Sequence, residues 1–65
     1  MKLVARRLRD ARFKLGLTQD MLAGISGVSQ SCIGNYEAGR RQPTLRHAFK
    51  VCRALSLNIY DLFEE

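Results

Sequence analysis

One stretch of the chain places hydrogen-bonding groups along a single side of a helix that we expect over about residues 29–38. At about 100° per residue, two amides, a hydroxyl and a glycine fall on one side, and apolar residues fall on the other. Amide side chains can make paired hydrogen bonds to an adenine edge, and a serine hydroxyl can serve several bases. The polar set is Gln30, Ser31, Gly34 and Asn35, and the apolar set is Cys32, Ile33 and Tyr36.

Two short helices joined by a glycine turn are expected to hold this polar side in place. Thr18 is a suitable N-cap for a first helix over about residues 19–25. Gly27 suits the turn, because glycine adopts a positive φ without steric cost. Ser29 then caps the second helix, and Gly39 ends it.

The order of residues in this stretch resembles the helix-turn-helix of the Cro and phage-repressor family, the lambda repressor-like proteins. With the loop GRRQPT and the closing segment DLF, the resemblance runs from about Val4 to Phe63. It implies an all-α fold, namely a compact five-helix DNA-binding domain over residues 1–65 whose helices 2 and 3 form the motif. The residues that carry the motif are Gln19, Ala23, Gly27, Val28, Ile33 and Tyr36.

The resemblance also implies a function. Family members lay the first helix of the motif across the DNA backbone and insert the second, the recognition helix, into the major groove. For this chain it implies a sequence-specific transcriptional regulator, a phage or prophage repressor or Cro-like protein, that binds a pseudo-palindromic operator in double-stranded DNA as a homodimer. Gln30, Ser31 and Asn35 would read bases, and Gly34 would permit close approach to the groove.

Other side chains around the motif are expected to bind DNA phosphates. Arg40 and Arg41 stand side by side in a loop just beyond the recognition helix. The resemblance implies a phosphate contact at Gln19, where the free N–H groups at a helix start favour an anion. Thr18, Ser29 and Arg12 complete the expected phosphate set.

The resemblance further implies an ion pair between Arg12, late in the first helix, and Glu37, at the end of the recognition helix. We expect this pair to be partly buried and to position Arg12 towards the DNA backbone. Removal of either partner would leave a costly uncompensated charge.

The remaining helices are expected to complete the core. The first spans residues 3–15, the fourth follows the cap Thr44, and the last begins after Asn58, which forms a capping-box-like pair with Asp61. Ser56 stands at a helix end and requires a left-handed serine or a different turn. The apolar residues expected to pack in these helices and the second one are Val4, Leu8, Ala11, Phe13, Leu15, Met21, Leu22, Ile25, Leu45, Ala48, Phe49, Val51, Cys52, Leu55, Leu57, Leu62 and Phe63.

Ile59 and Tyr60 are the apolar residues left over on the short last helix. They are interpreted either as further core or as a two-fold contact with a second copy. The second interpretation is what the resemblance implies, since dimers of this family often meet through this end, and both interpretations stay open.

Composition limits the function classes. The chain has 65 residues and a net charge of +5, from eleven Lys and Arg against six Asp and Glu, which suits a polyanionic partner. It contains no carboxylate pair, nucleophile–histidine set or glycine-rich phosphate loop, so we expect no enzyme. Cys32 and Cys52 are expected to be reduced core residues, with His47 at the surface or core boundary.

No cofactor, metal or small-molecule ligand is therefore expected. The chain lacks an apolar run near the roughly 20 residues of a membrane span. We expect a cytoplasmic protein, bacterial or phage-encoded and associated with the nucleoid when bound. Two alternatives stay open: the control protein of a restriction–modification or toxin–antitoxin system, and a protein-interaction module that has lost DNA binding.

Overall fold

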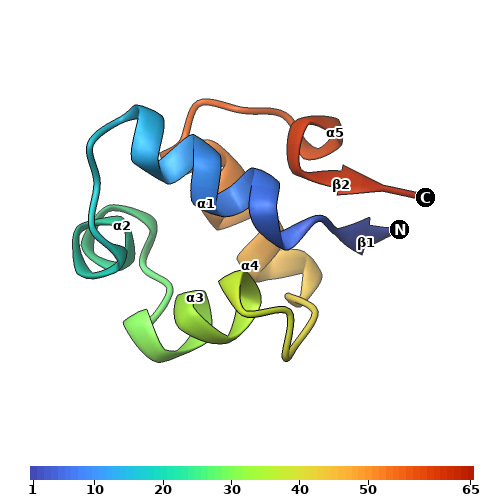
Figure 1. Cartoon of the computed structure of the whole chain (residues 1–65), viewed down its shortest axis with the longest axis horizontal. Coiled ribbons are helices and arrows are strands. Elements are labelled where there is room, and N and C mark those ends of the chain that lie inside the picture. The colour runs from blue at the N-terminus through green and yellow to red at the C-terminus, as the bar shows by residue number, and fades with distance from the viewer.

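Five α-helices follow one another along the chain and enclose one apolar core (Figure 1). In the computed structural model, which describes residues 1–65, they are α1 (Ala5–Lys14), α2 (Gln19–Ser26), α3 (Gln30–Glu37), α4 (Leu45–Ala54) and α5 (Ile59–Leu62). α2 packs against α3 and α4, and α1 packs against α3 and α5. This arrangement confirms the expected helical fold with five helices.

Two short strands that the sequence did not predict join the ends of the chain. β1 (Lys2–Leu3) pairs antiparallel with β2 (Phe63–Glu64), with Lys2 opposite Glu64 and Leu3 opposite Phe63. The pairing satisfies backbone hydrogen-bonding groups near both termini. The side chains of Leu3 and Phe63 are buried, so both ends of the chain are also anchored in the core. The first helix consequently begins at Ala5 instead of residue 3, and it ends at Lys14 instead of residue 15.

The predicted helix caps are present. The hydroxyls of Thr18, Ser29 and Thr44 each accept a hydrogen bond from the backbone N–H three residues further on, at 3.0–3.1 Å. Asn58 and Asp61 form the reciprocal capping box at the start of α5. Each cap satisfies backbone donors that the first turn of its helix leaves without a partner.

Two of the predicted turn positions, Gly27 and Ser56, have a left-handed backbone. Gly27, between α2 and α3, has a φ of 77°. Ser56, just after α4, has a φ of 57°. Of the two alternatives predicted for this helix end, the left-handed serine is therefore the one that occurs. A residue other than glycine pays a steric cost in this conformation.

The core draws its most deeply buried side chains from across the chain. Leu8, Leu22, Val28, Ile33 and Leu62 come from α1, α2, the turn after α2, α3 and α5, and each is at most 1% exposed. The two motif helices therefore share one core with α1, α4 and α5.

The two cysteines are free, as predicted. Cys32 is half-buried and packs against the core, while Cys52 lies within it. Burial raises the pKa of the Cys52 thiol, which keeps it protonated at neutral pH. No group of histidine, cysteine and carboxylate side chains in the structure is arranged to hold a metal ion.

Six apolar residues that were expected to pack inward are exposed instead. On α4, residues 48, 51 and 52 face the core, and the side chains of residues 45 and 49 project from a neighbouring side that no element covers. On α2, Leu22 takes the core side, so residues 21 and 25 face solvent. The exposed residues are Phe13, Leu15, Met21, Ile25, Leu45 and Phe49, each 49–66% exposed.

Candidate nucleic-acid interface

α3 buries one side and leaves its polar side open. Ile33, Tyr36 and Glu37 are buried, whereas the residues at positions 30 and 31 are exposed and the glycine and asparagine at 34 and 35 are half-buried. The four residues predicted to face bases thus lie together on the outer side of α3. They share a shallow surface depression with one residue of α2 and one of the following loop. Its lining contains no hydrophobic residue and consists of Gln19, Gln30, Ser31, Gly34, Asn35 and Arg40.

α2 and α3 approach closely at Gly34. A Cβ atom at this position would lie 3.5 Å from the Gln19 side-chain oxygen Oε1, which is ordinary van der Waals contact. The packing of α2 against α3 would therefore tolerate a larger residue at position 34. Glycine at this position keeps the outer surface of α3 low beside Gln19.

A buried network ties the motif to α1, and it contains the predicted ion pair. Arg12 Nε donates to Glu37 Oε2 at 2.7 Å, and Arg12 Nη2 donates to Glu37 Oε1 at 2.8 Å. The two side chains are only 8% and 5% exposed. Gln19 Nε2 also donates to Glu37 Oε1, at 3.2 Å. Glu37 consequently holds both the guanidinium of α1 and the first side chain of α2.

The network keeps both charges in place. Burial by itself would raise the pKa of Glu37, but the hydrogen bonds from Arg12 and Gln19 and the nearby positive charges outweigh it and lower that pKa. The hydrogen bond to Glu37 raises the pKa of Arg12. Glu37 is therefore ionised at neutral pH despite its burial.

Arg12 makes its contacts inside the protein. Its remaining nitrogen, Nη1, donates to the Leu17 backbone oxygen at 2.8 Å, and its guanidinium carbon lies 4.6 Å from the centre of the Phe13 ring. Arg12 is the only buried residue among the expected phosphate ligands, so its main role in this structure is to hold Glu37.

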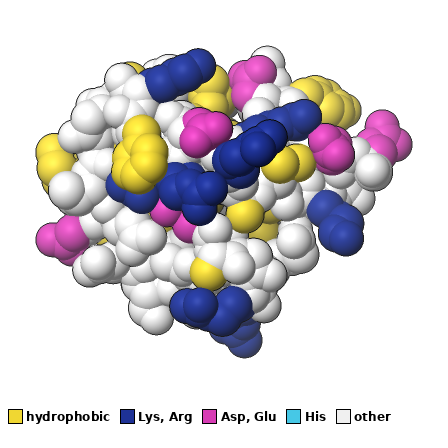
Figure 2. All heavy atoms as spheres, viewed as in Figure 1, with side chains coloured by type: hydrophobic (Ala, Val, Ile, Leu, Met, Phe, Trp, Pro, Cys, Tyr) yellow, Lys and Arg dark blue, Asp and Glu magenta, His cyan; other side chains and the backbone are white.

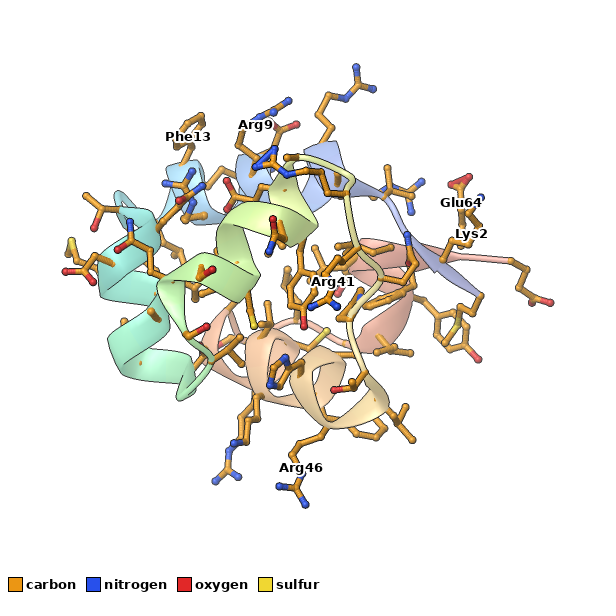
Figure 3. All side chains as sticks on the ribbon, turned by 90° about the horizontal axis from the view of Figure 1, so that it is seen from below. Lys2, Arg9, Phe13, Arg41, Arg46 and Glu64 are labelled. Carbon is orange, nitrogen blue, oxygen red and sulfur yellow. The ribbon has the colours of Figure 1, made fainter.

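The other expected phosphate ligands border the same surface. Thr18 and Ser29 are exposed, and each hydroxyl uses its oxygen to cap a helix, so its own hydrogen stays available to a phosphate. Arg41 is exposed, and Figure 3 shows it beside α3 on the face that carries the polar depression. Arg40 differs, because its Nε donates to Asn35 Oδ1 at 3.2 Å and its side chain lies back against α3.

Positive charge surrounds this region. Figure 2 shows lysine and arginine side chains gathered at the lower edge, where α3 and the loop to α4 lie in Figure 1. In the view onto α3, Arg9 of α1 and Arg46 of α4 lie on opposite sides of that helix (Figure 3). The outer side of α3 is thus an uncharged polar surface with cations around it.

A family model described as helix-turn-helix matches residues 6–62 of the chain. The chain belongs to the helix-turn-helix family. An uncharacterized HTH-type transcriptional regulator of Archaeoglobus fulgidus is 42% identical over 57 residues, which cover 88% of this chain and 81% of that protein.

Solved helix-turn-helix structures share the fold. The restriction-modification controller protein C.AhdI from Aeromonas hydrophila has a TM-score of 0.86 and 37% identity, over 91% of this chain and 89% of that one. The P22 c2 repressor, solved in complex with a synthetic operator, has a TM-score of 0.85 and 28% identity, over 95% and 96%. The family resemblance in the sequence is thereby confirmed, and it is a family of DNA-binding transcriptional regulators, which is not a class of enzymes.

In this helix-turn-helix domain, α2 and α3 are the two helices of the motif, with Gly27 at the turn. None of the five helices combines the length and apolar character that a membrane crossing requires.

Two hydrogen bonds and one electrostatic interaction around the helix-turn-helix were missed at the sequence level. Gln42 Oε1 accepts a hydrogen bond from the Leu3 backbone N–H at 2.8 Å, which ties the loop after α3 to β1. The Tyr36 hydroxyl lies 2.6 Å from His47 Nδ1, so α3 is joined to α4, and His47 is half-buried at the core boundary as expected. Arg9 is close enough to Glu37 to lower the pKa of that carboxyl. Of these three, only the interaction of Arg9 could have been found in the sequence. Arg9 lies three residues before Arg12, so the two share one helix face and both come near Glu37.

The two residues proposed for a dimer contact differ in their surroundings. Ile59 is half-buried and packs against the core, whereas Tyr60 is 70% exposed. The interpretation of Ile59 as core is therefore supported by the structure, and Tyr60 is the member of the pair that is free to meet a partner.

Proposed function

We propose that residues 1–65 act as one sequence-specific DNA-binding domain of a transcriptional regulator, of the phage or prophage repressor or Cro-like type. The observation that carries the proposal is the outer side of α3. Five polar residues and one glycine from α2, α3 and the following loop form one continuous surface there, with no hydrophobic residue in its lining. A surface of hydrogen-bonding groups fits base edges, which present donors and acceptors in the major groove.

In this proposal α3 enters the major groove. The amides of Gln30 and Asn35 and the hydroxyl of Ser31 face the base edges, and Gly34 lets the helix backbone come close to them. The buried hydrogen bonds of Glu37 to Arg12 and Gln19 hold α3 in a fixed orientation relative to α1 and α2.

DNA phosphates are held by groups around α3. Thr18 and Ser29 donate their free hydroxyl hydrogens, and Arg41 supplies positive charge. Gln19 is the first residue of α2, where free backbone N–H groups favour an anion. Arg9 joins this set from the structure, since it lies near Glu37, at the end of α3, and lowers the pKa of that carboxyl. Arg12 retains at most a secondary phosphate contact, because its donors already serve Glu37 and Leu17.

Two copies bind a pseudo-palindromic operator. Successive major grooves on one side of DNA are about 34 Å apart, so a symmetric dimer presents one α3 to each half-site. Tyr60 on α5 supplies an exposed aromatic ring for the two-fold contact. A regulator of this kind acts on the chromosome, so we place it in the cytoplasm, associated with the nucleoid when bound.

A second candidate is a controller protein of a restriction–modification system. It is favoured by the likeness to C.AhdI, which has the higher sequence identity of the two solved structures described above. Both candidates bind DNA through the same surface, and the genes beside the coding sequence distinguish them. Restriction and methyltransferase genes support the controller, and prophage genes support the repressor.

The test is selection of bound DNA from a random duplex library at two salt concentrations. We expect an enriched inverted repeat and an affinity that falls steeply with salt, because bound phosphates release counterions. Enrichment of a single unrepeated site would remove the symmetric dimer. Absence of any enriched sequence would overturn base reading and favour a protein-interaction module.

A further inference from the structure

Arg40 is held against α3 by two hydrogen bonds to one residue. Its backbone N–H donates to the Asn35 backbone oxygen at 3.0 Å, and its side-chain Nε donates to Asn35 Oδ1 at 3.2 Å. Gly39, with a φ of 72°, makes the reversal that brings residue 40 back over the last turn of α3. Arg40 therefore has a defined position at the end of the recognition helix, although it belongs to the loop.

The terminal end of the Arg40 guanidinium is free. Nη1 and Nη2 make no hydrogen bond within the protein, and Arg40 takes part in neither of the two salt bridges. The side chain lines the same polar depression as Gln30, Ser31 and Gly34. A positioned pair of N–H groups on a groove-facing surface matches the O6 and N7 acceptors of guanine, the commonest specific contact of arginine with DNA.

We propose that Arg40 reads a guanine in each half-site and that Asn35 is the positioning residue that aims it. The proposal rests on the DNA-binding function proposed above and assigns Arg40 to base recognition instead of the phosphate contact expected from the sequence. Asn35 offers its carbonyl oxygen to Arg40 and keeps its amide hydrogens for a base. The operator then carries a guanine next to the base pair that Asn35 faces.

The adjacent arginine supplies the matched control. Arg41 has the same charge and is one residue further along the loop, but the structure gives it no hydrogen bond to α3. We assign the sequence-independent phosphate contact to Arg41. The two arginines thus differ in the kind of DNA contact and not in charge.

The experiment compares the DNA preferences of the wild type with those of Arg40→Lys and Arg41→Lys, each selected on the random duplex library. Lysine keeps the charge but cannot form the planar two-pronged contact. We expect Arg40→Lys to lose at least about fivefold of the preference for guanine at one position of each half-site, with the other positions unchanged. Arg41→Lys should retain the wild-type preferences at every position.

A second pair of variants tests the positioning role of Asn35. Asn35→Asp keeps an oxygen that can accept from Arg40 Nε, whereas Asn35→Ala removes it. Asn35→Asp should therefore keep the guanine preference at the Arg40 position, and Asn35→Ala should reduce it. Adding Arg40→Lys to Asn35→Ala should reduce it little further, because both changes disable the same contact.

The outcomes separate the two proposals. A wild type that enriches no sequence would overturn the proposed function. A wild type that enriches a motif in which no guanine preference depends on Arg40 would overturn this inference alone. Arg40→Ala that weakens all sequences equally and lowers the salt slope by about one would identify Arg40 as a phosphate ligand and also overturn the inference.

Discussion

Glu37 connects folding and recognition at the scale of single residues. Its carboxylate binds Arg12 of α1 through two hydrogen bonds and Gln19 of α2 through a third. The same residue ends α3, so the position of the recognition helix depends on a charge inside the protein. Removing one partner of such a pair is costly because the other stays buried without compensation.

We therefore predict that Glu37→Ala lowers the free energy of unfolding by about 3 kcal/mol. Glu64→Ala is the matched control, since it removes an ion pair with Arg7 whose side chains are 45% and 61% exposed. Its effect should stay below about 1 kcal/mol. Urea unfolding monitored by circular dichroism measures both, and equal midpoints for Glu37→Ala and the wild type would contradict the prediction.

Acid should reduce the contribution of Glu37. Its pKa is lowered in the folded state, so its stabilisation is complete above the ordinary value of 4.5 and is lost as the pH falls through the folded value. We predict that the difference in stability between the wild type and Glu37→Gln is largest near pH 7 and narrows below about pH 4. Urea midpoints measured from pH 7 to pH 3 test this, and a gap that is constant or widens in acid would refute it.

At the scale of elements, α2 and α3 each contain one glycine inside a helix. Gly24 and Gly34 both have helical backbone, and an added methyl group meets nothing within 4 Å at Gly24 and only Gln19 Oε1, at 3.5 Å, at Gly34. Glycine lowers helix stability at both sites, so a reason for it must be sought outside the fold. Only Gly34 lines the polar depression on α3.

Replacing these two glycines by alanine should separate stability from DNA binding. We predict that Gly24→Ala and Gly34→Ala each stabilise the domain, by up to about 1 kcal/mol. Only Gly34→Ala should weaken binding to the selected operator, because its methyl group holds α3 away from the groove floor. Thermal unfolding and fluorescence anisotropy give the two readouts, and a loss of affinity in Gly24→Ala alone would reverse the assignment.

At the scale of the whole molecule, the strand pairing brings both termini and α5 to one end of the fold, away from α2 (Figure 1). Tyr60 projects from α5 with 70% of its surface exposed, whereas its neighbour Ile59 packs against the core. A two-fold contact at this end would leave the α3 surfaces of both copies free for DNA. Tyr60 is the one exposed large hydrophobic residue of α5.

We predict that Tyr60→Asp weakens binding to an inverted repeat by about tenfold or more, while binding to an isolated half-site stays unchanged. Ile25→Asp is the control, because Ile25 is a similarly exposed apolar residue on α2 (58%). Analytical ultracentrifugation with and without operator follows the assembly. Wild-type assembly of Tyr60→Asp on the inverted repeat would place the dimer contact elsewhere.

Local sequence signals determined much of this protein. The caps at Thr18, Ser29 and Thr44, the turn at Gly27 and the polar side of α3 depend on neighbours within four residues, and all are present in the structure. The family motif added the pairing of α1 with α3 through Arg12 and Glu37, which lie 25 residues apart.

Tertiary structure alone decided which apolar residues are covered and how the loop residues are oriented. Leu45 and Phe49 follow the helical pattern of α4, yet they are exposed because no element packs over that side. The pairing of β1 with β2 joins two-residue segments more than 50 residues apart, too short to give a sequence signal. Arg40 and Arg41 look equivalent in the sequence, but the reversal at Gly39 directs only Arg40 back to Asn35, because a hydrogen bond depends on position in space and not on composition.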